Sequence, residues 1–258
     1  MSVVRTAAEV ARFQATVLRR SPGDLMVLVN TPLLTVIFLA ITRHAGRTDL
    51  DAYSVLAPAV MALWSMAVIV SGEIISRDRA AGTLELLLAS PASITLVVSV
   101  RILVVTVVSL VALAEAWLVA TFGFGVRLVI HHPAAFGVTL LVTAAATAGW
   151  ASAMSGIFVL ARSARTFQNS ISYPFFLLGG VVVPTSLLPG WLQPVCDAVY
   201  LSWASDLLRD ATKPAAVTSF GGRLGVVALL GLAGFALGHA LLRATAKRVR
   251  GTGEVAFA

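Results

Sequence analysis

Charged side chains are scarce in this chain of 258 residues. Asp, Glu, Lys and Arg together make up 12% of it, about half of the roughly 25% that is usual in soluble domains. Hydrophobic residues make up 58%, and the mean hydropathy is +0.92. So little charge cannot cover a soluble surface of this size, and the same composition excludes intrinsic disorder. The scarcity predicts an integral membrane protein.

The sequence also lacks the residues of a catalytic or metal centre. Its one cysteine, Cys196, excludes an internal disulfide and a multi-cysteine metal site. No phosphate-binding loop signature and no H-E-x-x-H pattern occurs. His131 and His132 are adjacent, so their side chains diverge and make a poor chelate. We therefore expect no catalytic residue, no metal site and no cofactor bound by this chain.

Long apolar runs are what the sequence has in abundance. A helix needs about 20 apolar residues to cross a hydrocarbon core of about 30 Å. The runs are continuous rather than alternating, which favours helices over a barrel. We predict an all-α membrane protein in which Pro32 kinks the first span. The six predicted transmembrane helices are residues 25–41, 53–75, 94–122, 135–161, 167–188 and 224–242.

Residues 1–23 are predicted to form an interfacial segment rather than a span. Arginines and other polar residues recur at helical spacing on one face of residues 3–20, and apolar residues fall on the other. Such a helix lies in the headgroup plane of the inner leaflet. The sequence Ser-Pro-Gly at 21–23 then breaks it. A soluble helical tail is the alternative interpretation.

The distribution of basic residues predicts the orientation. With a cytoplasmic N-terminus, thirteen of the 19 basic residues lie on the inner side. This asymmetry favours cytoplasmic termini at both ends and an even number of spans. The net charge of +7 then reflects topology, and no nucleic acid is needed as a partner. Arginine outnumbers lysine 17 to 2, which hints at a GC-rich genome such as that of an actinobacterium, hence a bacterial plasma membrane. The six outer residues are Arg43, Arg47, Arg127, Arg209, Lys213 and Arg223.

The most specific pattern lies between the second and third predicted spans. Residues 73–93 read EIISRDRAAGTLELLLASPAS. Arg77, Asp78 and Arg79 form a charged turn, and a short helix with leucines on one side follows. Glu85 stands in the first turn of that helix, where the helix dipole favours a carboxylate. A short amphipathic helix just below the membrane is suited to docking into a groove of a partner protein.

This segment resembles the ABC-2 type transporter permeases, the transmembrane subunits of exporters of drugs, antibiotics and polysaccharides. The similarity rests on the glutamate, the basic-acidic-basic turn, the Gly-Thr-Leu-Glu sequence and the Ser-Pro pair. It continues at Arg165 and Asn169, at Pro184 and the LPGWL sequence of 188–192, and at 200–209. Ala81 stands where an acidic residue is usual, and Ser90 where threonine is usual.

The resemblance implies a permease that forms, with a second copy or a sister permease, the path of a lipid-like, amphipathic or drug-like substrate. It implies that residues 76–91 form a cytoplasmic coupling helix docked on a separate ABC ATPase subunit, which would use ATP and magnesium. The permease itself would not be an enzyme. A segment that merely caps the third span is the alternative. The candidate ATPase-coupling residues are Arg77, Asp78, Arg79, Gly82, Thr83 and Glu85.

Polar and aromatic residues in the spans are candidates for the translocation path or its gate, because charge in hydrocarbon is costly. Other roles stay open: Glu73 can pair with Arg77, Glu115 can meet water at the outer interface, and the aromatics can pack in lipid or core. Arg101 is predicted to snorkel to the inner headgroups. The candidate path residues are Glu73, Glu115, Asn169, Tyr173 and Phe176.

The stretch 184–213, between the fifth and sixth predicted spans, is long and aromatic and contains few charges. It predicts short helices that re-enter the outer leaflet. The whole chain is then an interfacial helix (1–23), a six-helix transmembrane domain (24–250) and a cytoplasmic tail (251–258), in contact with membrane lipids. An ATPase-independent secondary transporter or channel is the alternative function. It predicts inverted repeats and buried charge chains, and we find neither in the sequence.

Overall fold

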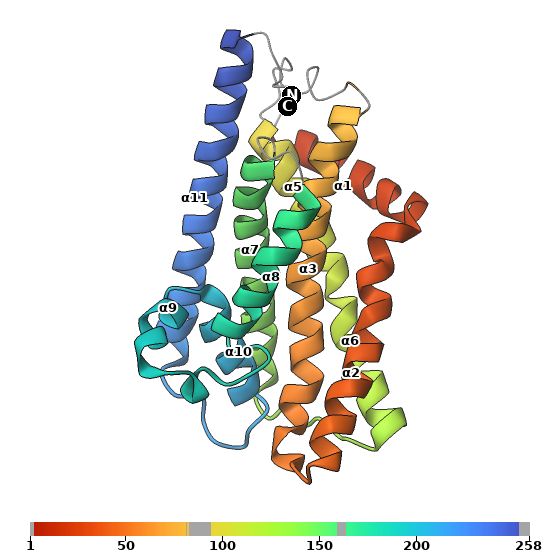
Figure 1. Ribbon diagram of the computed structural model, residues 1–258, viewed down its shortest axis with the longest axis vertical. Helices are drawn as coiled ribbons and strands as arrows, with labels where there is room; N and C mark the ends of the chain where they lie inside the picture. Colours follow the sequence, from red (N-terminus) through yellow and green to blue (C-terminus); the bar gives the residue numbers. More distant parts are fainter. Residues whose placement is uncertain (1–2, 81, 83–93, 159–163, 253–258) are drawn as a thin grey trace.

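The computed structural model describes residues 3–80, 82, 94–158 and 164–252, and within these residues the chain is helical with no strand. Figure 1 shows long helices running along one axis, with helix α1 lying across the bundle. Helix α1 and the C-terminal end of helix α11 lie towards the same end. We call this the proximal end and the opposite one the distal end.

The predicted amphipathic helix is present as α1, Val3–Arg20. Its predicted polar face is exposed, whereas Gln14 and Leu18 on the other side are buried against the bundle. The turn η1, Pro22–Leu25, follows where the Ser-Pro-Gly sequence predicts a break. Helix α2, Met26–His44, then runs to the distal end and continues through Pro32.

Helix α3 is the central helix of the bundle. After the turn η2, Thr48–Leu50, it runs from Asp51 to Ala80. Its 30 residues correspond to about 45 Å. Helices α2, α5, α6, α7, α8 and α10 all contact it. Trp64 and Met66, near its middle, are completely buried.

The third and fourth predicted spans have the predicted limits to within a few residues. The third consists of α5, Ile94–Ser109, and α6, Val111–Leu118, followed by the π-helical turn η3, Val119–Gly123. The interruption at Leu110 follows two hydroxyls that bond back to the helix, Thr106 to the carbonyl of Ile102 and Ser109 to that of Thr106. Helix α7, Pro133–Phe158, is the fourth.

The fifth predicted span is shorter than the predicted 167–188. Helix α8 covers Ala164–Leu178 and ends there in a Schellman motif. The Val181 N–H donates to the carbonyl of Phe176 at 3.1 Å, and the Gly180 N–H donates to that of Leu177 at 3.1 Å. Gly180 has a φ of +59°, a left-handed conformation that glycine adopts without strain. The prediction that the helix continues to Leu188 is therefore wrong.

Short helices at the distal end connect α8 to the last long helix. They are η4, Thr185–Leu187; η5, Gly190–Leu192; α9, Gln193–Asp197; and α10, Tyr200–Asp210. Helix α11, Phe220–Thr252, then returns to the proximal end along α7.

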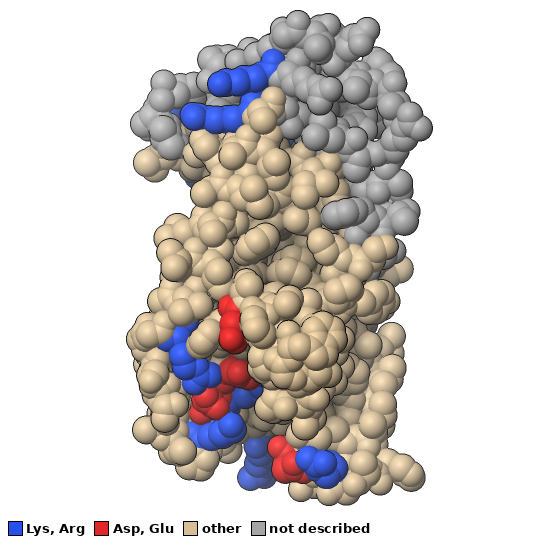
Figure 2. Space-filling view, turned by 60° about the vertical axis from the view of Figure 1, so that its left-hand side comes forward, with Lys and Arg blue, Asp and Glu red and all other residues tan. Residues whose placement is uncertain are grey.

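Five helices of the described residues are long and apolar enough to cross a bilayer: Met26–His44, Thr48–Glu73, Thr95–Gly123, Pro133–Phe158 and Phe220–Ala244. The described part of α8, 15 residues, is below that length. Figure 2 shows the matching surface on one face, where a band without charged side chains separates the two ends. The multi-pass helical architecture is thus as predicted, and five of the six predicted spans meet this criterion within the described residues.

Candidate functional site

A cavity of about 330 Å³ lies between helices α2, α3 and α8. Four residues of α2, five of α3 and four of α8 form its wall. Most are apolar, and the polar ones are amides, hydroxyls and one phenol. They are Val27, Asn30, Thr31, Leu34, Pro58, Met61, Ala62, Ser65, Ile69, Gln168, Ser172, Tyr173 and Phe176.

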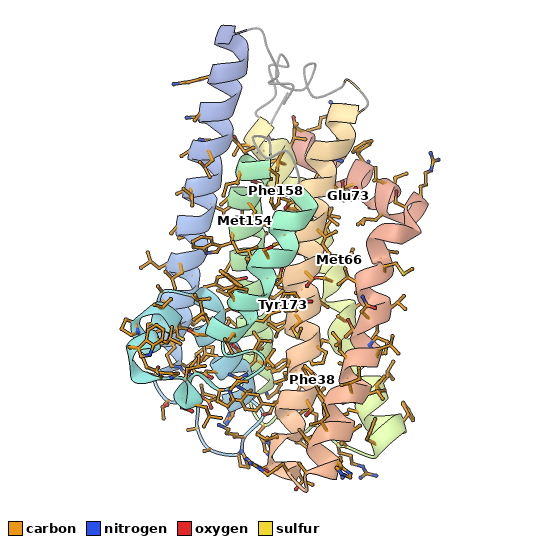
Figure 3. The ribbon with its side chains drawn as sticks, in the orientation of Figure 1. Phe38, Met66, Glu73, Met154, Phe158 and Tyr173 are labelled. Atoms are coloured by element: carbon orange, nitrogen blue, oxygen red, sulfur yellow. The ribbon has the colours of Figure 1, made fainter. Side chains whose placement is uncertain are left out.

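A second cavity, of about 240 Å³, lies nearer the distal end on the same side of α2 and α3. Along α2 the lining residues of the two cavities recur once per helical turn, at Val27, at Asn30 and Thr31, at Leu34, at Phe38, and at Ile41 and Thr42. Residues at this spacing share one helix face, so the two cavities follow the same seam. Figure 3 labels one lining residue of each, Tyr173 and, further towards the distal end, Phe38. The lining residues are Phe38, Ile41, Thr42, Leu50, Tyr53, Ser54, Ala57, Val182 and Pro184.

One wall of the first cavity is fixed by contacts between α3 and α8. The Gln168 side chain donates from Nε2 to the carbonyl of Val68 at 3.0 Å. Trp64 donates from Nε1 to Ser172 Oγ at 3.2 Å, and its ring stacks on Phe175 at 4.0 Å between centroids. Such hydrogen bonds are difficult to exchange in hydrocarbon because no water competes for them. Helix α8 is therefore held on α3, while α2 forms the other wall.

Two of the candidate path residues meet in this cavity. Tyr173 is 74% exposed and Phe176 is 5% exposed, and both line it. Glu73 is half-buried near the proximal end of α3, outside the lining set. The Asn169 side chain lies outside the described residues, although its backbone belongs to α8. The structure thus groups the aromatic candidates.

Glu115 lies apart from them on α6, which packs against α2 and α3. Its side chain is partly buried, and Oε2 has no hydrogen-bond partner among the described residues. It lines neither cavity.

The predicted coupling segment lies mostly outside the described residues. Arg77, Asp78 and Arg79 belong to the last turn of α3, but their side chains, together with Thr83 and Glu85, are not among those described. Gly82 has a φ of +65°, and a methyl group added there would meet no atom within 4 Å. This residue follows a helix end in the left-handed conformation that is typical of such ends.

Comparison with known families identifies the architecture. The family model of the ABC-2 type transporter matches residues 7–212, well over half of the chain. The chain belongs to the ABC-2 type transporter family. Members are typically the non-enzymatic transmembrane component of a transporter, and the family in general implies an ABC ATPase partner. A search of curated proteins finds no match.

In this ABC-2 protein Arg101, which was predicted to snorkel to the headgroups, is buried against helix α1. It is 6% exposed on α5, and its Nε donates to Gln14 Oε1 of α1 at 2.8 Å. The guanidinium also lies over the Phe13 ring, 5.4 Å from the centroid. Helix α1 packs on this part of α5 and supplies a hydrogen-bond acceptor for Arg101. Sequence reasoning missed the contact because the partners are 87 residues apart.

Arg209, on α10, is a second buried arginine of the ABC-2 domain and was not among the predicted site residues. It is 5% exposed. Its Nη1 donates to the carbonyl of Gly180 at 2.9 Å, and its Nη2 donates to Asp206 Oδ1 at 2.6 Å. The guanidinium lies over the Tyr53 ring of α3, 4.0 Å from the centroid. Its position in a long stretch with few charges was the available signal.

An ion-pair cluster follows Arg209 at the distal end. Asp210 accepts from Arg223 Nη1 at 2.7 Å and from Lys213 Nζ at 3.0 Å. Burial by itself raises the pKa of Asp210, but the hydrogen bonds from the two cations outweigh it and lower the pKa below its ordinary value. The carboxylate form is therefore favoured, and it connects α10 to the first turn of α11.

Proposed function

We propose that this chain is the permease subunit of an ABC exporter, which forms the path of a lipid-like, amphipathic or drug-like substrate. The observation that supports it best is the cavity of about 330 Å³ between α2, α3 and α8 in a protein of the ABC-2 type transporter family. ATP and magnesium are then used by a separate ATPase subunit, and this chain binds no cofactor of its own.

The cavity wall suits an amphipathic substrate. Its surface is mostly alkyl and aromatic, with Asn30, Ser65 and Gln168 as hydrogen-bonding groups. Ligand sites of this kind bind by apolar contact and orient the ligand with a few polar groups. Only 17% of the apolar stretch of α2 is buried in the single chain, which leaves this helix free to border the second permease or the lipid from which an apolar substrate would enter.

Charge placement supports a cytoplasmic proximal end. Five of the six basic residues assigned to the outer side form ion pairs with Asp: Arg43, Arg47, Arg209, Lys213 and Arg223. The distal charges thus largely cancel, and the excess of arginine belongs to the proximal side. By the positive-inside rule, which counts Lys and Arg, the thirteen basic residues assigned to the inner side against six on the outer side support cytoplasmic termini.

Helix α3 connects the cavity to the predicted coupling segment. Ile69 lines the cavity, and Arg77 follows eight residues later on the same helix, about 12 Å along the axis. A force that the ATPase applies to residues 76–91 would therefore move a cavity wall directly. A second permease, identical or related, completes the path and carries a second ATPase.

Glu85→Lys tests the coupling role. We expect the reversed charge to weaken co-purification of the partner ATPase at least about tenfold, as for loss of a charge contact at a buried interface. Glu9→Lys, on the exposed face of α1, is the matched charge reversal and should leave co-purification unchanged. Normal co-purification and transport by Glu85→Lys would rule out the coupling helix.

Tyr173→Ala tests the path. Tyr173 is exposed in the single chain, so its truncation should cost little stability, yet it should lower substrate-stimulated ATPase activity. Leu177→Ala, one turn away on α8 and outside the lining set, is the control. Equal activity of the two variants would remove Tyr173 from the path.

A further inference from the structure

We propose that Arg209 is a positioning residue that latches the distal cap, residues 179–210, onto α3, and that the inner side controls this cap through α3. The second part rests on the exporter function proposed above, whereas the latch itself does not. The distal cap contains the non-helical turn after α8 and the short helices η4 to α10.

Two donors of α10 hold the start of the cap. Ser205 Oγ donates to the carbonyl of Gly179 at 2.6 Å, and Arg209 Nη1 donates to that of Gly180 at 2.9 Å. Non-helical backbone at membrane depth needs such partners, because an unsatisfied carbonyl there is costly. A methyl group added to Gly180 would lie 2.9 Å from Thr185 Cγ2, so the turn is also closely packed.

Further contacts make the cap one unit. Gln193 Nε2 donates to the carbonyl of Thr185 at 2.8 Å, and Trp203 Nε1 donates to that of Asp197 at 2.9 Å. Ser202 Oγ donates to the carbonyl of Cys196 at 2.7 Å. These bonds join η4, α9 and α10 to one another, so the segments move together.

The contact between Arg209 and Tyr53 crosses from the cap to α3. The bonds of Arg209 to Gly180 and Asp206 stay inside the cap and keep the guanidinium partly neutralised. Of the contacts of Arg209, only the one with the ring, 4.0 Å from the guanidinium carbon to the centroid, is lost if the distal end of α3 moves away from the cap, whose helix α10 stays packed on α7 and α11. A cation over a ring is weaker than a charge-assisted hydrogen bond, so this is the contact of Arg209 that opens first.

The distal cavity lies next to the contact between Arg209 and Tyr53, and both α3 and the cap line it. Tyr53 lines that cavity from α3, and Val182 and Pro184 line it from the cap. Separation of Tyr53 from Arg209 therefore widens the cavity of about 240 Å³ towards the distal surface. The same movement would open the seam along α2 at its distal end.

Helix α3 can transmit the movement. It is one helix from the turn beside Tyr53 to Ala80, next to the predicted coupling segment. Pro58 lies between the two ends and has no N–H to donate to the carbonyl of Ser54. Residues 51–57 can therefore tilt on the rest of α3, and the contact with Arg209 determines that tilt.

Leu208 provides the measurement, because it lies on α10 and lines one small cavity together with Leu56 and Val60 of α3. It is 1% exposed, and Cys196 is the only cysteine of the chain, so Leu208→Cys combined with Cys196→Ser leaves one thiol between the cap and α3. Labelling of that thiol by a membrane-impermeant maleimide, in the full chain reconstituted with its ATPase, reports separation of the cap from α3. We expect Tyr53→Leu in this background to be labelled at least about three times faster than the background with Tyr53 intact, which stands for the natural chain. Tyr53→Phe keeps the ring and should be labelled at the natural rate.

Labelling in the presence of nucleotide tests separately whether Arg209 holds the cap and whether the ATPase controls the cap through α3. ATP with vanadate should change the labelling rate of the natural chain and leave that of Tyr53→Leu unchanged. Unaltered labelling of Tyr53→Leu, even with a lower melting temperature, would overturn the latch, as would equal acceleration in Tyr53→Phe. If the ATPase binds but nucleotide has no effect on the natural chain, control through α3 is overturned. If no ATPase binds, the exporter function fails, while the difference between the two Tyr53 variants still tests the latch.

Discussion

Helices α2 and α11 both lie at the edge of the bundle, but they are attached to it in opposite ways. Only 17% of the apolar stretch of α2 and 22% of that of α11 is buried. Helix α11 packs on α7 with no room for side chains: a methyl group on Gly149 would lie 2.5 Å from the carbonyl oxygen of Gly231. Helix α2 is instead separated from α8 by a cavity of about 330 Å³.

This difference divides the bundle into a fixed and an adjustable side. Where backbones touch, dispersion contacts are dense and neither helix can move without losing them. Where a cavity separates helices, one wall can shift without breaking such contacts. Helix α3 lies between the two sides and contacts both α7 and α2. Movement during transport is therefore expected on the α2 side, against a fixed pair of α7 and α11.

Gly234→Leu should separate α11 from α7 and lower the stability more than any other substitution proposed here. A Cβ on Gly234 would lie 2.9 Å from the backbone nitrogen of Trp150 and 3.0 Å from the carbonyl carbon of Gly149. The helices would have to separate, at a cost of about 3 kcal/mol or more for a side chain of this size. The melting temperature in detergent measures it.

Gly225→Leu is the matched control, because a methyl group there meets nothing within 4 Å on the same helix. Leucine has a higher helix propensity than glycine, so this variant should be as stable as the natural chain or slightly more so. Equal destabilisation by both substitutions would show that the contact between α7 and α11 is unimportant.

Ser65→Leu tests whether the cavity beside α2 can be filled, and its effect on stability should be intermediate. Ser65 lines the cavity and is half-buried, so a leucine has space to fill and should change the free energy of unfolding by less than about 1.5 kcal/mol. Compounds that bind the cavity raise the melting temperature of the natural chain by mass action. In a panel of lipids and amphipathic drugs, they should no longer do so with Ser65→Leu.

Ala67→Leu, two residues further along α3 and fully buried, is the contrasting control. It has no cavity to fill and should destabilise the protein. If Ser65→Leu destabilises as strongly, or if ligand-induced shifts persist in it, the cavity is no binding site.

Asp210→Asn tests the distal attachment of α11 and should have the smallest effect. Because the folded protein lowers the pKa of Asp210, the carboxylate stabilises the fold above its unfolded pKa of about 3.9. That stability is lost as the pH falls towards the lower folded pKa. At pH 7 the free energy of unfolding of the natural chain should therefore exceed that of Asp210→Asn by about 1 kcal/mol or less, as for a partly exposed ion pair. Its melting temperature should be slightly higher.

The melting temperatures of the two proteins should converge below about pH 4. Arg223→Gln removes one of the two cations and should reduce the difference at pH 7. A difference that is independent of pH would show that the ion pair is not its source.

The sequence predicted helix limits well where the pattern was local. The interfacial helix was predicted at 3–20 and is Val3–Arg20, because its polar and apolar faces alternate with helical period. The end of α8 at Leu178 is also a local feature, but the predicted span continued past it to Leu188. Gly179 and Gly180 lie inside an apolar run, and hydropathy alone does not recognise a Schellman motif.

The site was less predictable because it depends on packing between distant segments. Tyr173 and Phe176 were named as candidates from their span, but the cavity they share with α2 follows from the position of α2. The contacts of Arg101 with Gln14 and of Arg209 with Tyr53 could not be predicted either, because these residues approach one another only in the folded bundle. Glu115 was named with the path residues because of its charge, and it lies on α6, outside both cavities.

The early end of α8 has a consequence for the thickness of the apolar barrier. From Gly179 to Pro184 the backbone is non-helical, and the carbonyls of Gly179 and Gly180 accept from Ser205 and Arg209. The described part of α8, 15 residues or about 22 Å, is shorter than a bilayer core of about 30 Å. Where this helix borders lipid, a polar group that leaves the cavity crosses less hydrocarbon than it would beside α7, whose 26 residues correspond to about 39 Å.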